Sequence, residues 1–113
     1  MVDSDTVRED GSLTVRVERD GDALLIHALG ELDLSNTKTL EAELRRAIGT
    51  GASAVVLDLG GLAFIDSAGL RLLLLADRQS RRNGGRLTMR RGSFAVQRTV
   101  ELSGLDKELP FKD

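Results

Sequence analysis

Cysteine, tryptophan and tyrosine are absent from this 113-residue chain, which has a single proline and only three phenylalanines. The absence of cysteine excludes disulfides, thiolate catalysis and cysteine-based zinc or iron–sulfur sites. The scarcity of aromatic side chains that stack on bases argues against nucleic acid binding. No apolar run reaches the roughly 18 residues that span a bilayer, and the acidic N-terminus lacks the apolar core of a signal peptide. We therefore expect a cytoplasmic protein that contacts neither nucleic acid nor membrane.

Length and charge are those of one small domain. A chain of this size buries roughly two-thirds of the surface that it exposes when unfolded, which is enough for one core. Sixteen basic and eighteen acidic residues give a formal net charge of −2, so we expect no general electrostatic attraction to polyanions. The composition predicts a flexible segment over residues 1–10 and a single domain over residues 11–113.

Two strands are predicted in the first part of the chain. Residues 13–20 alternate between apolar and polar side chains, which is the pattern of a strand with one solvated face. Residues 23–29 are almost wholly apolar and follow the turn Asp20-Gly21-Asp22, so the two stretches are expected to form a hairpin. The lone histidine, His27, falls in the second strand, and there is no second histidine to share a metal. We assign it no functional role.

Helix and strand patterns alternate after residue 30. Apolar residues recur at helical spacing from Thr37, with Ser35 as the expected cap, and a glycine at 49 or 51 ends this helix. A strand over residues 54–59 follows, and Gly60-Gly61 is expected to break it. Because a second helical pattern comes next, the order favours crossover connections and parallel strand pairs.

The last part of the chain contains four predicted elements. A helix runs from Ser67 to about Asn83, a short strand covers residues 86–90, and a helix over residues 94–102 starts behind Ser93 as its cap. Residues 105–111 are predicted to form an edge strand, because their proline is hard to place in a central one.

The junction Asp66-Ser67 is the most informative pair in the sequence. Both residue types are favoured helix N-caps, because their side-chain oxygens accept hydrogen bonds from unpaired amides of the first turn. A phosphate on Ser67 would lie beside those amides and the positive end of the helix dipole, so the fold could tolerate it. On pattern alone, capping is the commoner meaning of such a pair.

The leucines after Ser67 do not form a single helical stripe. Leu70, Leu73 and Leu74 share one side, whereas Leu72 and Leu75 point elsewhere. This pattern fits either a helix that is buried on a broad face or an apolar patch that docks a protein partner beside Ser67.

No enzyme constellation is present in the sequence. The loop glycines match neither common phosphate-binding motif, and nothing places a general base near Ser67. Asp33, Asp58 and Asp66 could gather at strand ends around a magnesium ion, but solvation and capping explain them more simply. We expect no catalytic activity, no metal and no cofactor.

Four segments resemble the successive signatures of the STAS domain, and among STAS proteins the similarity is to stand-alone bacterial anti-sigma factor antagonists. The segments are Gly30-Glu31-Leu32-Asp33, Val55 to Leu59, Phe64-Ile65-Asp66-Ser67-Ala68-Gly69-Leu70, and Leu102-Ser103-Gly104-Leu105. The resemblance covers about residues 13–111. It implies the STAS fold, an α/β architecture with a small mixed β-sheet and three to four helices packed mainly on one face.

The resemblance also implies a partner switch. The unphosphorylated antagonist would bind an anti-sigma factor that is also a serine kinase, and so release the sigma factor. The kinase would phosphorylate Ser67, and a PP2C-type phosphatase would reverse this. Ala68 stands where some relatives carry a second hydroxyl, and the chain stops at Asp113, where many relatives add a final helix. The implied partner-binding residues are Asp33, Asp66, Ser67, Ala68, Gly69, Arg71, Leu72 and Leu75.

Other functions remain open at this point. The same fold could serve as an accessory subunit of a membrane lipid ABC transporter or as a non-catalytic STAS scaffold. A nucleotide-binding enzyme is less favoured, because the sequence lacks a phosphate loop and a catalytic base.

Overall fold

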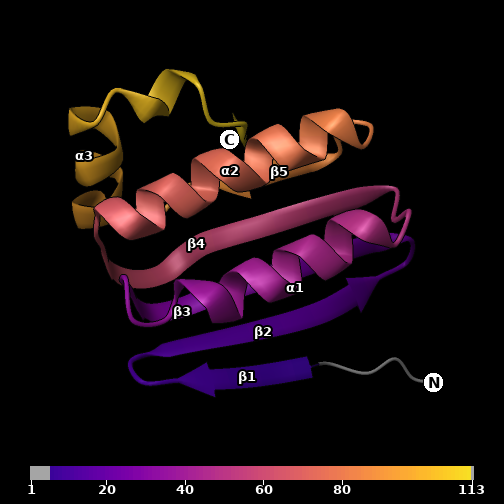
Figure 1. Ribbon diagram of the computed structural model, residues 1–113, viewed down its shortest axis with the longest axis horizontal. Coiled ribbons are helices and arrows are strands. Elements are labelled where there is room, and N and C mark those ends of the chain that lie inside the picture. The colour runs from indigo at the N-terminus through magenta and orange to yellow at the C-terminus, as the bar shows by residue number, and fades with distance from the viewer. Residues whose placement is uncertain (1–5, 113) are drawn as a thin grey trace.

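The computed structural model describes residues 6–112, which form an α/β fold built on one mixed sheet (Figure 1). The sheet has six strands in the order β1-β2-β3-β4-β5-β6. The strands are β1 (Thr6–Asp10), β2 (Leu13–Asp20), β3 (Ala23–Leu32), β4 (Ala54–Ile65), β5 (Leu87–Arg90) and β6 (Phe111–Lys112). The helices in this part of the chain are α1 (Thr37–Gly49), α2 (Ser67–Arg82), α3 (Phe94–Leu102) and the short 3-10 helix η1 (Leu105–Lys107).

The strand connections follow from their directions. Strands β1 to β3 are antiparallel, and β3 to β6 are parallel. A tight turn joins β2 to β3, where Gly21 adopts a φ of 61°. Parallel neighbours need a crossover, which α1, α2 and α3 supply. Figure 1 shows α1 and α2 side by side on one face of the sheet, with α3 beside the start of α2. The predicted hairpin, crossovers and mixed sheet are confirmed.

Alternating side chains of the sheet form the core against these helices. In β3, every second residue from Leu24 to Ala28 is buried, and the residues between them lie on the opposite face. On that face the His27 ring is hydrogen-bonded to Glu18 (Nε2 to Oε1, 2.6 Å) and to Asp58 (Nδ1 to Oδ2, 3.2 Å). His27 is thus held within the sheet by two neighbouring strands.

The predicted flexible segment over residues 1–10 is wrong for Thr6–Asp10, which form strand β1; residues 1–5 lie outside the described part. β1 pairs antiparallel with β2 along its whole length. The Arg8 guanidinium also reaches the buried Glu43 carboxylate of α1 at 3.5 Å. The local composition of this segment is charged and carries no strand signal, so its structure comes from partners elsewhere in the chain.

Strand β4 does not stop at Gly60-Gly61 as predicted but continues to Ile65. Its pairing with β3 runs through the two glycines with two shifts of register. Such bulges let a strand bend without ending, and the Gly60 amide is satisfied by the Asp58 carboxylate at 2.8 Å. Strand β3 is also longer than predicted, because the extended β4 gives it a pairing partner as far as Leu32.

The predicted edge strand over residues 105–111 is also wrong in extent. Its first residues form η1. The Leu105 carbonyl accepts hydrogen bonds from the Glu108 and Leu109 amides, and the Leu109 side chain is buried. Strand β6 consists of Phe111–Lys112, directly after Pro110, whose carbonyl accepts a hydrogen bond from the Met89 amide of β5 at 3.0 Å. Because proline has no amide hydrogen to donate to the ladder, the strand begins after it.

Candidate functional site

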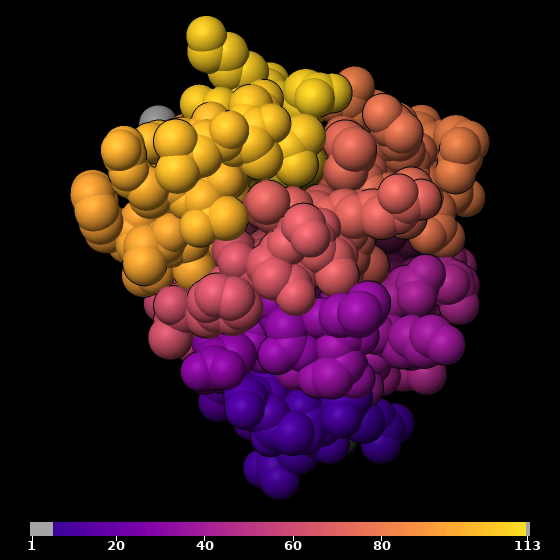
Figure 2. Space-filling model, turned by 60° about the vertical axis from the view of Figure 1, so that its left-hand side comes forward, coloured from indigo at the N-terminus to yellow at the C-terminus, as the bar shows by residue number. Residues whose placement is uncertain are grey.

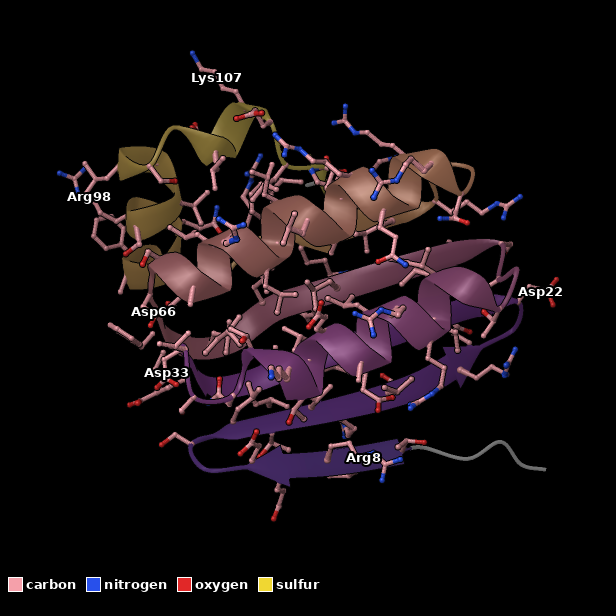
Figure 3. The ribbon with its side chains drawn as sticks, viewed as in Figure 1. Arg8, Asp22, Asp33, Asp66, Arg98 and Lys107 are labelled. Carbon is pink, nitrogen blue, oxygen red and sulfur yellow. The ribbon has the colours of Figure 1, made fainter. Side chains whose placement is uncertain are left out.

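Two loops meet at one end of the sheet, the β3–α1 loop and the β4–α2 junction. Since β3 and β4 are parallel, with Leu32 opposite Ile65, their carboxyl ends lie together. Figure 3 shows the two aspartates that follow these strands, Asp33 and Asp66, as neighbours at this end. Figure 2 brings the same end forward, with the β3–α1 loop, the start of α2 and α3 forming one continuous face.

Asp66 links the two loops and starts α2. It is the N-cap of that helix, and its Oδ1 accepts a hydrogen bond from the Gly69 amide at 3.0 Å. Its Oδ2 accepts a second bond from the Leu34 amide at 3.1 Å, and its own amide donates to the Leu32 carbonyl at 3.2 Å. The predicted helix start is confirmed, with Asp66 as the capping residue.

Ser67 is the first residue of α2 and is exposed to solvent. Among the described residues, none forms a hydrogen bond with its hydroxyl, because Asp66 performs the capping. The first-turn amides and the helix dipole favour negative charge at this position. The site therefore presents an accessible hydroxyl where the fold can accept a phosphate.

The β3–α1 loop is held by a residue that the sequence did not mark. Asn36 is 1 % exposed; its Oδ1 accepts from the Asp33 amide and its Nδ2 donates to the Glu31 carbonyl, both at 3.0 Å. Ser35, the predicted cap, instead donates its amide and hydroxyl to the Asp33 carboxylate. Asn36 is the N-cap of α1, but its side chain accepts no hydrogen bond from the first-turn amides of that helix. An asparagine next to a predicted cap was the only sequence signal, because Asx side chains often bond to nearby backbone groups.

Some of the predicted site residues of α2 are exposed and others are buried. Arg71 and Leu75 are exposed on successive turns after Ser67, and Leu75 is 45 % exposed. Leu72 is only 6 % exposed, so its side chain belongs to the core and not to the surface. The buried stripe of α2 runs through positions 69, 72, 73, 76 and 80, because the helix packs against both the sheet and α1.

Gly69 is buried and acts through its lack of a side chain. A Cβ at this position would lie 2.6 Å from Ile65 Cγ1 and 3.1 Å from Leu32 Cδ2. Glycine thus lets the first turn of α2 approach the ends of β3 and β4. Ala68, the next residue toward the N-terminus, is half-buried. Gly69 therefore positions Ser67, and its own surface is not available to a partner.

We define the Ser67 surface as Asp33, Leu34, Asp66, Ser67 and Arg71. It combines a hydroxyl, two carboxylates and a guanidinium with Leu34, which is 78 % exposed. Sequence patterns did not mark Leu34, since a single leucine in a short loop has no periodicity. Leu34 thus adds one exposed apolar side chain to the polar groups of this surface.

Within the part of the chain that the structure describes, no histidine or carboxylate is hydrogen-bonded to the Ser67 hydroxyl. The His27 ring is held by Glu18 and Asp58 within the sheet, and Asp66 is engaged by two amides. In residues 6–112, no three histidine, aspartate or glutamate side chains come together as a metal site would require. No helix in that range has the length and apolar character needed to cross a membrane.

The fold and this surface define a class of protein. Residues 15–111 match the family described as Mlab, STAS domain, and the chain belongs to this STAS family. The match runs from within β2 to the first residue of β6 and includes both loops of the Ser67 surface.

The similar proteins include several anti-sigma factor antagonists. BtrV of Bordetella bronchiseptica, named as an anti-sigma factor antagonist, is 42% identical over 84 residues, which are 74% of this chain and 72% of BtrV. The structure of an anti-sigma factor antagonist from Mycobacterium paratuberculosis superposes with a TM-score of 0.79 at 26% identity, covering 88% of this chain and 85% of that one. The antagonist SpoIIAA in its unphosphorylated form gives 0.72 at 27% identity, covering 88% and 86%. Its phosphorylated form, from Bacillus, gives 0.66 at 26% identity, covering 88% and 89%.

Proposed function

We propose that this chain is an anti-sigma factor antagonist that is switched off by phosphorylation of Ser67. In its unphosphorylated state it binds an anti-sigma factor serine kinase and thereby releases the sigma factor. The same kinase phosphorylates Ser67, and a PP2C-type phosphatase restores the active state. The observation that carries this proposal is the exposed Ser67 hydroxyl at the first position of α2, without a hydrogen-bond partner in residues 6–112. The family and the similar antagonists support it.

The charges around Ser67 explain how a phosphate would act. Phosphoserine adds about −1.5 to −2 charge, which the amides and dipole at the start of α2 stabilise. Arg71 lies one helical turn further on, where it can pair with the phosphate. A partner packed over Asp33 and Asp66 would have to bury this new charge beside two carboxylates. The modification therefore leaves the fold intact and weakens the complex.

Phosphorylation itself provides the direct test of this function. Incubation with Mg-ATP and the cognate anti-sigma kinase is expected to add one phosphate to Ser67, which intact-mass spectrometry with site mapping detects. The Ser67→Ala variant is the matched control and should gain none. No modification of the wild type by any active anti-sigma kinase of its organism would contradict the proposal and favour the transporter-subunit or scaffold function.

Leu75 provides a test of the partner surface that does not touch the phosphorylation site. Leu75→Asp is expected to weaken binding of the anti-sigma kinase at least tenfold, or about 1.4 kcal/mol, because the leucine is exposed two turns after Ser67. The free energy of unfolding should change by less than about 1 kcal/mol. Calorimetric titration and urea denaturation measure the two effects.

The matched control for Leu75 is Leu72→Asp, which places the same carboxylate in the core. It is expected to lower the free energy of unfolding by about 3 kcal/mol or more, since a buried charge has no partner there. If Leu75→Asp destabilised the protein as much as Leu72→Asp does, Leu75 would act in the fold and not in the complex.

A further inference from the structure

Helix α3 exposes two large apolar side chains to solvent. Phe94 is 85 % exposed and Leu102 is 75 % exposed, although the opposite side of the same helix buries Val96 and Val100. Arg98 lies between them, one helical turn from each, so the three side chains form a row along the outer side of the helix. We call Phe94, Arg98 and Leu102 the α3 row.

The α3 row lies at the same end of the molecule as the Ser67 surface. The Ser93 hydroxyl caps α3 and also donates a hydrogen bond to the Leu62 carbonyl of β4 at 3.2 Å. A Cβ on Gly92 would lie 3.1 Å from the Leu59 carbonyl oxygen, so this segment runs directly against β4. Since β4 leads into Ser67, α3 starts beside the site, and Figure 2 shows α3 and the start of α2 on one face.

The two surfaces differ in the charged groups that they present. The Ser67 surface is rich in carboxylates, from Asp33 and Asp66, whereas the α3 row has a guanidinium between two apolar groups. No carboxylate within the described residues forms an ion pair with Arg98, which is exposed. A protein segment with apolar side chains on either side of an acidic residue would match the α3 row in both shape and charge.

We infer that the α3 row is a second contact for the anti-sigma kinase that binds the Ser67 surface. This inference rests on the proposed function, and it assigns different parts of the binding affinity to the two surfaces. The α3 row supplies affinity that does not depend on the phosphate, because it presents no group to Ser67 itself. The Ser67 surface supplies the part of the affinity that phosphorylation removes. The same row also holds the kinase in place while it modifies Ser67.

Steady-state phosphorylation and calorimetric binding test this inference with the full chain and its cognate kinase. Phe94→Ala and Arg98→Glu are each expected to raise Kd of the unphosphorylated protein about tenfold and to raise KM for Ser67 phosphorylation by a similar factor. The rate constant kcat should stay within about twofold, because the α3 row does not touch the reacting hydroxyl. Arg98→Glu should also slow association more strongly at low salt.

Matched controls change the same chemistry elsewhere. Val7→Ala removes an exposed apolar side chain from β1, and Arg82→Glu reverses an exposed charge at the far end of α2. Both controls should bind and be phosphorylated like the wild type. If Phe94→Ala and Arg98→Glu also behaved like the wild type, the inference would be wrong while the proposed function stood. A wild type that neither binds an anti-sigma kinase nor is phosphorylated by one would refute both.

Discussion

Ser67→Asp is expected to lower the affinity for the anti-sigma kinase by about 100-fold, which corresponds to about 3 kcal/mol, while the thermal unfolding midpoint changes little. The substitution places a permanent charge at the first position of α2. In the free protein this charge is exposed and faces the first-turn amides, which favour it. In the complex it would be desolvated near the carboxylates of Asp33 and Asp66, which repel it.

Two further variants separate the charge from other effects. Ser67→Ala removes the hydroxyl without adding charge, so it should bind like the unphosphorylated wild type and remain bound in the presence of Mg-ATP. Ser53→Asp adds the same carboxylate at an exposed position just before β4, at the opposite end of that strand, and should not alter binding. Calorimetric titration with the kinase gives the affinities. Equal affinities of the wild type and Ser67→Asp would show that Ser67 is not the switch.

Gly30→Ala is expected to destabilise the fold by about 3 kcal/mol or more, at the upper end of the usual range for single substitutions. Gly30 has a φ of 97°, a conformation that side chains with a Cβ rarely adopt. A Cβ there would lie 2.0 Å from the backbone oxygen of Ser12, which is the acceptor for the Glu31 amide at 3.0 Å. Because the overlapping Ser12 oxygen is a backbone atom, β2 and β3 would have to separate to relieve the overlap.

The comparison for Gly30 is Gly49→Ala. Gly49 is the last residue of α1, has no positive φ, and a Cβ there would meet no atom within 4 Å. This substitution is expected to be neutral or to stabilise the protein by up to about 1 kcal/mol, since alanine is the better helix former. Urea denaturation of both variants measures the difference. Similar midpoints for Gly30→Ala and Gly49→Ala would rule out the proposed backbone overlap.

Gly30 also connects the fold to the site. It stands at one of the register shifts between β3 and β4, directly before the residues that lead to Asp33. We therefore expect Gly30→Ala to affect binding as well as stability. The variant molecules that remain folded should bind the kinase with lower affinity than the wild type does. The glycine of the G-E-L-D motif is explained by this close approach of two strands, and not by contact with a partner.

The features that the sequence determined by itself are those that depend on neighbouring residues. The start of α2 at Asp66 and Ser67 follows from capping, which acts within one helical turn. The hairpin of β2 and β3 follows from alternation and a glycine turn, and the parallel pairs follow from intervening helices. These choices are local in the chain, so composition and spacing were sufficient to predict them.

Tertiary structure alone decided which of these residues reach the surface. Leu72 and Leu75 look alike in the sequence, but packing of α2 against both the sheet and α1 buries the first and exposes the second. Strand β1 and the extension of β4 exist because distant strands supply their hydrogen-bond partners. The buried bonds of Asn36 and the approach of α3 to the Ser67 surface likewise join segments far apart in the chain, and no local pattern encodes such contacts.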